Sequence, residues 1–224
     1  MNRKPVIAID GPPGSGKTTV SKLIAEKLGY KRIDTGAMYR AAALVAKRAG
    51  VEFVDEEVIA KLLGDLTIDF AIVPGGQRIL VGGIDLEDQI RSEEVGKWAS
   101  DISKVQAARK ILLKKQKMMG AQGGVVCEGR DATTVIFPDA EFRYFLDASA
   151  YKRAERRYRE LVSAGANPAF KDVFEDMIRR DIQDCTRDNS PLCLAHGVNY
   201  VDTTTLSPDE VARIILKEVK KNGG

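Results

Sequence analysis

The sequence predicts an α/β protein in which a parallel sheet carries helices on both faces. Short, uninterrupted apolar runs recur along the chain, and such runs are typical of parallel strands that are buried on both sides. Longer stretches with apolar residues at helical spacing separate these runs. This alternation of strand and helix is the pattern of a layered α/β domain.

The first part of the chain begins with a strand and continues mainly as helices. Val6–Ile9 is a short apolar run that predicts a fully buried strand. A Gly/Pro-rich turn follows, and then a helix from about Lys17, with Gly29 as its stop signal. Further helices are expected at Tyr39–Ala49 and Glu57–Leu63.

Between about residues 65 and 90 the apolar pattern changes to a period of two. Leu66–Phe70 alternates apolar and polar residues, as a half-buried strand does. After the turn signal at Pro74–Gly76, returning strands are expected at Arg78–Val81 and Ile84–Leu86. This segment therefore predicts a small antiparallel insert.

Helices and buried strands alternate again in the remaining chain. The expected strands are Val125–Cys127, Phe142–Leu146 and Val198–Val201. The expected helices are one capped by Ser92 and running through Trp98, then about Ser103–Met119, Ala150–Ala164 and Phe170–Cys185, and a last one opened by the capping box Ser207–Glu210.

The composition excludes several classes of protein. The 224 residues suffice for one buried core with a small insert or subdomain. Lys and Arg number 35 against 32 Asp and Glu, which is too small an excess to indicate a long basic surface for nucleic acid. No apolar run approaches the roughly 20 residues of a membrane span, and the start of the chain lacks the apolar core of a signal peptide. The three cysteines have no C-x-x-C spacing, which argues against a zinc site or disulfides and favours a reduced, cytoplasmic setting.

A phosphate-binding motif lies between the first strand and the first helix. Gly11–Thr18 fits G-x-x-x-x-G-K-[ST] in the strand–loop–helix context that this motif requires. Its glycines let backbone N–H groups point at phosphate oxygens, and the helix adds the positive end of its dipole. Lys17 is expected to reach the β- and γ-phosphates of ATP, and the Thr18 hydroxyl to ligate Mg²⁺. The expected nucleotide-binding residues are Gly11, Pro12, Pro13, Gly14, Ser15, Gly16, Lys17, Thr18 and Thr19.

The motif predicts binding of a nucleoside triphosphate but leaves the reaction open. A GTPase would carry Asn-Lys-x-Asp and Asp-x-x-Gly motifs, and neither occurs in the sequence. A mechanical ATPase would usually carry adjacent acidic residues at a strand end. Here Glu128–Asp131 mixes both signs of charge, which suits ligand recognition better than water activation. Asp10, just before the loop, is either a supporting partner of the site or simply a strand-end residue.

Four further clusters have the composition of a second anion site. They are Asp34–Arg40, Ser100 with Arg109, Glu128–Asp131, and Arg180 with Asp184 and Arg187. The last three residues have the spacing i, i+4, i+7, which predicts one face of a helix. Taken singly, Asp34–Gly36 is more often a turn or a helix cap, and the Arg180/Asp184/Arg187 set is more often a solvated row of ion pairs.

In order along nearly the whole chain, these pieces resemble the bacterial cytidylate (CMP) kinase family, which belongs to the nucleoside monophosphate kinases. The matching pieces are Ile9–Pro12 with Gly16–Lys17, Asp34–Arg40, Glu128–Asp131, Phe137–Ala140, Phe145–Ser149, the Arg180/Asp184/Arg187 set and Asp202–Ser207. The antiparallel insert lies where that family carries its extra monophosphate-binding segment. The resemblance implies a phosphate-loop core of residues 1–34, 105–150 and 186–224, a monophosphate-binding region of 35–104, and a short lid of two helices over 151–185.

The resemblance also implies a role for each group of residues. Those implied to recognise cytosine and its sugar are Thr35, Ser100, Arg109, Asp131, Asp184 and Arg187. Those implied to neutralise the CMP phosphate are Arg40, Arg130 and Arg180. Arg153, Arg156 and Arg157 resemble the family's lid arginines, and the implied catalytic set is Lys17, Arg130, Arg153, Arg157 and Arg180. A carboxylate accepts from the N4 amino group of cytosine but meets a second acceptor in uracil, and Asp131 is expected to make this discrimination.

The expected reaction is transfer of the γ-phosphoryl group of ATP to CMP or dCMP by a monomer without a nucleic-acid or membrane partner. The acceptor oxygen is already ionised at neutral pH, so no general base is required. Two alternatives remain at this point. One is a kinase for UMP, AMP or another small acceptor, and the other is a nucleotide-regulated nucleic-acid-binding module.

Three positions depart from the family pattern. The residue after Gly16–Lys17 is often glycine or serine in the family and is Thr18 here, which preserves Mg²⁺ ligation. Thr133 stands where the family usually has glycine. Glu155 lies within the arginine-rich stretch of the first lid helix, where it can pair with a neighbouring arginine, and the role of Arg156 as a lid arginine is left open.

Overall fold

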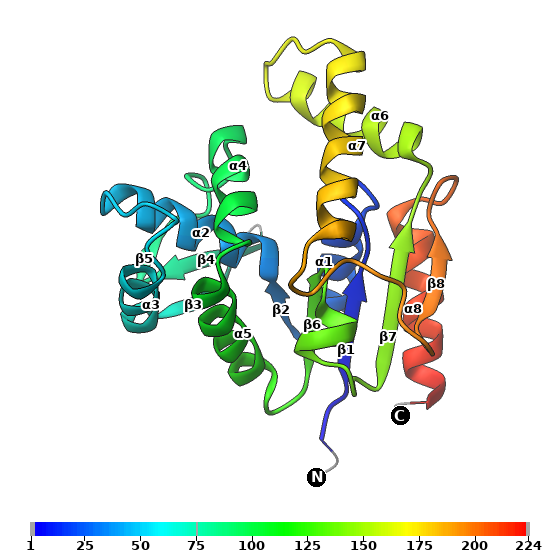
Figure 1. The fold of residues 1–224 in the computed structure, drawn as a ribbon. Coiled ribbons are helices and arrows are strands. Elements are labelled where there is room, and N and C mark those ends of the chain that lie inside the picture. The colour runs from blue at the N-terminus through cyan, green and yellow to red at the C-terminus, as the bar shows by residue number, and fades with distance from the viewer. Residues whose placement is uncertain (1–2, 75, 223–224) are drawn as a thin grey trace. The chain divides into compact units, whose positions relative to one another are not determined.

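The computed structural model describes residues 3–74 and 76–222, and Figure 1 shows their fold. The chain divides into two units. One consists of Met1–Tyr30 together with Gly124–Gly224, and the other of Lys31–Gly123. The second unit is therefore one continuous stretch inserted between the two parts of the first.

The larger sheet has the strand order β2-β6-β1-β7-β8. Its strands are β1 (Val6–Asp10), β2 (Lys31–Asp34), β6 (Val125–Gly129), β7 (Phe142–Asp147) and β8 (Asn199–Asp202). β1 pairs in parallel with β6 and β7, and β7 with β8, so these strands form a parallel sheet as predicted, although their order was not predicted. Every residue of β1 and β6 is buried, which explains the unbroken apolar run that opens each strand.

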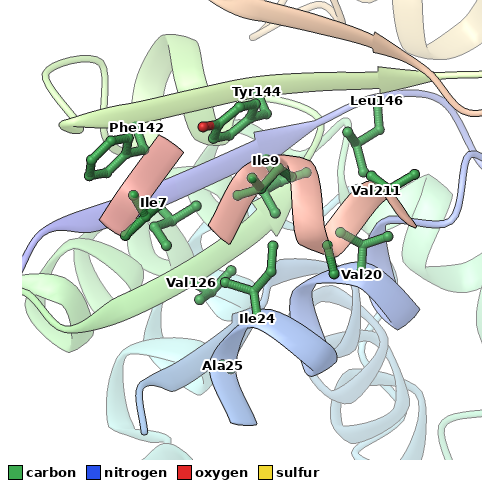
Figure 2. Packing of buried hydrophobic residues seen from close by; sticks show 13 residues of the cluster. Ile7, Ile9, Val20, Ile24, Ala25, Val126, Phe142, Tyr144, Leu146 and Val211 are labelled. Carbon is green, nitrogen blue, oxygen red and sulfur yellow. The ribbon is translucent and has the colours of Figure 1, made fainter. Parts of the chain in front are cut away.

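A hydrophobic core holds this sheet against α1 (Lys17–Leu28) and α8 (Pro208–Asn222), as Figure 2 shows. Val20 and Ile24 of α1 and Val211 of α8 are buried in it. Gly29 ends α1 in the left-handed conformation, as the sequence predicts. Ser207 and Glu210 form the predicted capping box of α8, because each side chain accepts from the backbone N–H of the other.

The arginine-rich helices α6 (Ala150–Ser163) and α7 (Phe170–Thr186) form a pair within the first unit. The ring of Phe170 packs between those of Tyr151 and Tyr158, with centroid distances of 5.2 and 5.8 Å. The two helices were predicted within one or two residues of these bounds. Aromatic packing, rather than charge, joins them at this end.

The second unit contains the predicted antiparallel insert. Its sheet has the order β3-β4-β5, formed by β3 (Ile68–Val73), β4 (Gly76–Val81) and β5 (Ile84–Asp85). Its helices are α2 (Thr35–Arg48), α3 (Glu56–Asp65), α4 (Glu93–Ile102) and α5 (Gln106–Gly120). Ser92 caps α4, as predicted, by accepting from the N–H of Val95. Position 75, within the predicted turn, lies outside the described residues.

Several predicted boundaries were wrong. α2 begins at Thr35 rather than Tyr39, because Asp34 already caps it. α4 continues past Trp98 to Ile102, so that α5 begins at Gln106 rather than Ser103. After β6 the chain forms a five-residue π-helix, η1 (Ala132–Ile136), which the sequence did not predict. Isolated π-turns have no distinct periodicity, so a pattern of apolar residues cannot reveal them.

No helix within residues 3–74 and 76–222 is long and apolar enough to cross a membrane.

Cys127, predicted as a core residue, is fully buried in β6.

Candidate active site

The phosphate loop leaves β1 and enters α1, and two of its positions admit only glycine. Gly11 has φ 148°, and a Cβ there would lie 1.9 Å from the carbonyl oxygen of Leu146. Gly14 has φ 75°, and a Cβ there would lie 2.9 Å from the carbonyl oxygen of Arg153. Gly16 precedes α1, and among the described residues no side chain caps this helix. The N–H groups of its first turn are therefore suited to an anion.

Lys17 is buried beside this loop. Its Nζ donates to the carbonyl oxygen of Pro12 at 2.7 Å and is 3.3 Å from Ser15 Oγ. Burial lowers the pKa of Lys17 well below its ordinary value, and Arg130 adds to the lowering, whereas nearby carboxylates oppose it. A bound polyphosphate would favour the charged ammonium, because an opposite charge offsets desolvation.

Glu128 is the acid that faces the loop, and sequence reasoning gave it no role of its own. Its carboxylate accepts from Thr18 Oγ1 and from Ser21 Oγ, both at 2.9 Å, and the residue is 3% exposed. Glu128 stands opposite Ile9 in the neighbouring strand. The carboxyl ends of adjacent parallel strands meet at one edge, so an acid at this position is brought to the loop. The acidic residue at the end of this strand is visible in the sequence, but its position beside the loop follows only from the order of the strands in the sheet.

The residues at the loop fit a magnesium ion. Thr18 and Glu128 supply a hydroxyl and a carboxylate, and oxygen ligands are those that Mg²⁺ prefers. In the described part of the chain, no group of three or more His, Cys, Asp or Glu could hold a metal ion by itself. This donor set matches a magnesium ion that is held jointly by one or two side chains and by nucleotide phosphates.

Asp10 joins the phosphate-loop strand to η1. Its Oδ1 accepts from the N–H of Ala132 at 2.8 Å, and its Oδ2 accepts from the N–H and the hydroxyl of Thr133 at 2.7 and 2.6 Å. Burial raises the pKa of Asp10, while these hydrogen bonds oppose the rise. The sequence left two interpretations of Asp10 open. Its hydrogen bonds to η1 favour a supporting partner of the site over a simple strand-end residue.

Arg130 and Asp184 form an ion pair within the first unit. Arg130 Nε lies 2.7 Å from Asp184 Oδ2. Burial by itself would raise the pKa of Asp184, but Arg130, together with Arg180 and Arg187, holds it below its ordinary value. Asp184 therefore stays ionised at neutral pH and can accept hydrogen bonds from a ligand.

Arg187 reaches Asp184 by a different route from the one predicted. The i, i+4, i+7 spacing placed it on a helix face with Arg180, but α7 ends at Thr186 and Arg187 is extended, with φ −66° and ψ 141°. Its Nε donates to the carbonyl oxygen of Ser190 at 2.7 Å, in the bend that follows α7. Its Nη1 still lies 3.8 Å from Asp184 Oδ1.

The second unit brings together a separate set of polar residues. Asp34 caps α2 by accepting from the N–H of Ala37 at 2.8 Å, and its other oxygen lies 3.3 Å from Arg32 Nη1. Arg32, Asp34 and the adjoining Thr35 are all buried. The Asp34–Thr35 motif, predicted to lead into a helix, thus begins the helix itself.

Three more predicted residues of the second unit lie on α2, α4 and α5. Arg40 of α2 donates to the carbonyl oxygens of Ile90 and Ser92. Ser100 lies on α4, which packs against α2. Arg109 of α5 is 8% exposed, and its guanidinium lies 5.7 Å from the ring centroid of Tyr39.

Comparison with known proteins identifies the family. A family model described as "Cytidylate kinase" matches residues 7–221. The chain is 44% identical over 216 residues to the cytidylate kinase of Geobacter sp. (strain M21), covering 96% of this chain and 93% of that one. It is 42% identical over 221 residues to the cytidylate kinase of Bacillus subtilis (strain 168), covering 99% of both. The chain belongs to the cytidylate kinase family.

A solved structure gives the same fold. An uncharacterized protein from Eubacterium ventriosum ATCC 27560 aligns with a TM-score of 0.53 and 13% identity, covering 98% of this chain and 100% of that chain. At this identity the likeness concerns the fold alone.

Within this member of the cytidylate kinase family, Arg153, Arg156 and Arg157 of α6 have distinct surroundings. Arg153 is 6% exposed, and its guanidinium donates one hydrogen bond to each carboxylate oxygen of Asp181, at 2.9 and 2.6 Å. Arg157 is half-buried and pairs with Glu160 at 3.2 Å, one turn along its own helix. The predicted lid arginines therefore do not lie in one environment.

Arg156, whose role as a lid arginine the sequence left open, contacts the phosphate loop directly. Its Nη1 donates to the carbonyl oxygen of Gly14 at 3.1 Å, and its Nη2 to that of Thr203 at 2.6 Å. The Thr203 hydroxyl in turn donates to the carbonyl oxygen of Ser15 at 3.0 Å. Glu155 pairs instead with Lys152 and Arg159. Three arginines within five positions are indistinguishable by composition, so only their contacts separate Arg156 from Arg153 and Arg157.

Proposed function

We propose that the protein transfers the γ-phosphoryl group of ATP to CMP or dCMP and releases ADP with CDP or dCDP. The observation that carries this proposal is membership of the cytidylate kinase family over residues 7–221. The buried lysine and the uncapped helix start at the phosphate loop support the donor half of the reaction.

The donor nucleotide is proposed to bind residues 11–19. Backbone N–H groups of the loop and of the first turn of α1 would hold the phosphates, and Lys17 would exchange its contacts with Pro12 and Ser15 for phosphate oxygens. Thr18 and Glu128 would hold Mg²⁺. When bound, this ion neutralises charge on the β- and γ-phosphates.

The acceptor nucleotide is proposed to be recognised by the residues that the family resemblance implies. Those proposed for cytosine and its sugar are Thr35, Ser100, Arg109, Asp131, Asp184 and Arg187; those proposed for the phosphate are Arg40, Arg130 and Arg180. The low pKa of Asp184 supports its role as an ionised acceptor. Asp131 would accept from the cytosine N4 amino group and repel the uracil carbonyl, which amounts to discrimination of a few kcal/mol.

Catalysis is proposed to consist of alignment and charge neutralisation. The CMP phosphate is already a nucleophile at neutral pH, so no side chain has to remove a proton. Cations would offset the repulsion between two polyanions, and the proposed set is Lys17, Arg130, Arg153, Arg157 and Arg180. Arg153 would have to exchange its ion pair with Asp181 for the phosphoryl group. In this proposal residues 151–185 act as the lid that excludes water.

We further propose that the protein acts in the cytoplasm as a monomer, without a nucleic-acid partner. Light scattering coupled to gel filtration tests the monomer. Titration with a labelled oligonucleotide at low and high salt tests the absence of a nucleic-acid partner, since such binding would be salt-dependent.

The direct test of the function is an ADP-release assay with ATP and each of CMP, dCMP, UMP, AMP and GMP. The proposal expects kcat/KM to be highest for CMP or dCMP and to fall at least tenfold for UMP. Rates on AMP that equal or exceed those on CMP would overturn the cytidine assignment. Omission of Mg²⁺ is expected to abolish ADP release.

A further inference from the structure

Asp10 makes hydrogen bonds that the proposed reaction does not use. The residue is fully buried, and its carboxylate accepts three hydrogen bonds of 2.6–2.8 Å, all from the first two residues of η1. A carboxylate with three short donors is a strong, directional anchor. The anchor ties the end of β1 to a segment more than 120 residues away in sequence.

The anchored segment begins directly after Asp131. Both polar atoms of the peptide group between Asp131 and Ala132 make hydrogen bonds. Its N–H donates to Asp10. Its C=O accepts from the N–H groups of Val135 and Ile136 at 2.9 and 3.0 Å. A peptide group is planar, so fixing both of its polar atoms also fixes the position of the Asp131 Cα. β6 holds the chain up to Gly129 on the other side of Asp131, so the Asp10 anchor restricts the directions in which the Asp131 side chain can point.

Thr133 supplies the part of the anchor that depends on a side chain. Its hydroxyl makes the shortest of the three bonds, 2.6 Å to Asp10 Oδ2, and the residue is 1% exposed. Any residue other than proline provides the two backbone donors, whereas only serine or threonine provides the third with this geometry. The neighbouring Thr134 is different, because among the described residues its buried hydroxyl has no hydrogen-bond partner.

The phosphate loop has supports that are independent of this anchor. Gly14 and Ser15 are held by Arg156 and Thr203 through their carbonyl oxygens. Loosening the contact between Asp10 and η1 should therefore disturb the segment that carries Asp131 more than the loop that binds ATP.

We infer that Asp10 and Thr133 act together as positioning residues that aim Asp131 at the acceptor base. This inference rests on the proposed function, because it assumes that Asp131 recognises the cytosine base. It assigns a task to the threonine that replaces the usual glycine of the family. It also predicts that acceptor affinity and base discrimination can be lowered without a matching change at the ATP site.

The test compares Thr133→Val, Thr133→Ser and the matched control Thr134→Val in the full-length protein. For each variant, KM for CMP, KM for ATP, the ratio of kcat/KM for CMP to that for UMP, and the melting temperature are measured. Thr133→Val is expected to raise KM for CMP about tenfold and to lower the CMP/UMP ratio, with KM for ATP changed less than about twofold. Thr133→Ser and Thr134→Val are expected to keep both quantities near wild type.

The outcomes separate a positioning role from a merely structural one. A Thr133→Val protein with a lower melting temperature but wild-type KM for CMP would overturn the inference. An equal rise in both KM values, or failure of Thr133→Ser to restore the CMP/UMP ratio, would overturn it as well. Wild-type protein that does not phosphorylate CMP would instead contradict the proposed function itself.

Discussion

Replacing Arg156 with glutamine tests whether α6 supports the phosphate loop. The guanidinium makes three hydrogen bonds of 2.6–3.2 Å, to the Gly14 and Thr203 carbonyl oxygens and to the Thr203 hydroxyl. A hydrogen bond from a charged donor contributes about 1.5–3 kcal/mol when it is buried. Arg156 is partly exposed, so solvent screening reduces this considerably. We expect Arg156→Gln to lower the free energy of unfolding by about 2 kcal/mol in all.

The matched control is Arg159→Gln on the same helix. The Arg159 side chain is 71% exposed and pairs with Glu155, so its loss should change the free energy of unfolding by less than about 0.5 kcal/mol. Both variants are measured by urea unfolding at constant m value, together with KM for ATP. Arg156→Gln is also expected to raise KM for ATP, because the loop loses a support at Gly14.

Two results would refute the reasoning. One is a destabilisation of Arg156→Gln no larger than that of Arg159→Gln. The other concerns Thr203→Val, which removes the hydroxyl between Arg156 and the Ser15 carbonyl oxygen. Because the two side chains share one network, their effects should not add in the double variant. Strict additivity would show that Arg156 does not act through Thr203.

Three further predictions address the loop and the acceptor pair. Lys17→Ala should lower kcat about a thousandfold in the ADP-release assay, and substantial residual turnover would contradict its role. Gly11→Ala should destabilise the protein by at least about 3 kcal/mol in urea unfolding, because its Cβ would lie 1.9 Å from the Leu146 carbonyl oxygen; normal stability would mean that this approach is not rigid. The pKa of Asp184 is lowered in the folded state, so its contribution to stability is present above its ordinary value of 3.8 and is lost as the pH falls below it. The free energy of unfolding of Asp184→Asn should therefore fall less steeply than that of wild type below about pH 3.8, and identical slopes would show that the Arg130 pair does not stabilise the fold.

Much of the local structure was predictable because its determinants lie close together in the chain. Buried strands such as Val6–Asp10 appear as apolar runs, and helix ends such as Gly29 and Ser207 depend on residues within one turn. The phosphate loop was equally predictable, since Gly11 and Gly14 adopt conformations that other residues avoid.

The contacts that organise the candidate site were not predictable in this way. The hydrogen bond from Thr18 to Glu128 joins residues 110 positions apart, and that from Thr133 to Asp10 joins residues 123 apart. Neither pair follows from composition or period, because both depend on which strands are neighbours in the sheet. Sequence reasoning therefore left Glu128 without a role and the role of Asp10 undecided.

By itself, then, the sequence determined the class of fold, the phosphate loop and the family, since these depend on local pattern and on motifs in a fixed order. Only the tertiary structure decided which charged residues act on which partners. Arg153, Arg156 and Arg157 are the same residue type within five positions, yet one pairs with Asp181, one supports Gly14 and one pairs with Glu160. The direction of a side chain on a helix and the element packed against it decide such roles, and both are properties of the folded chain.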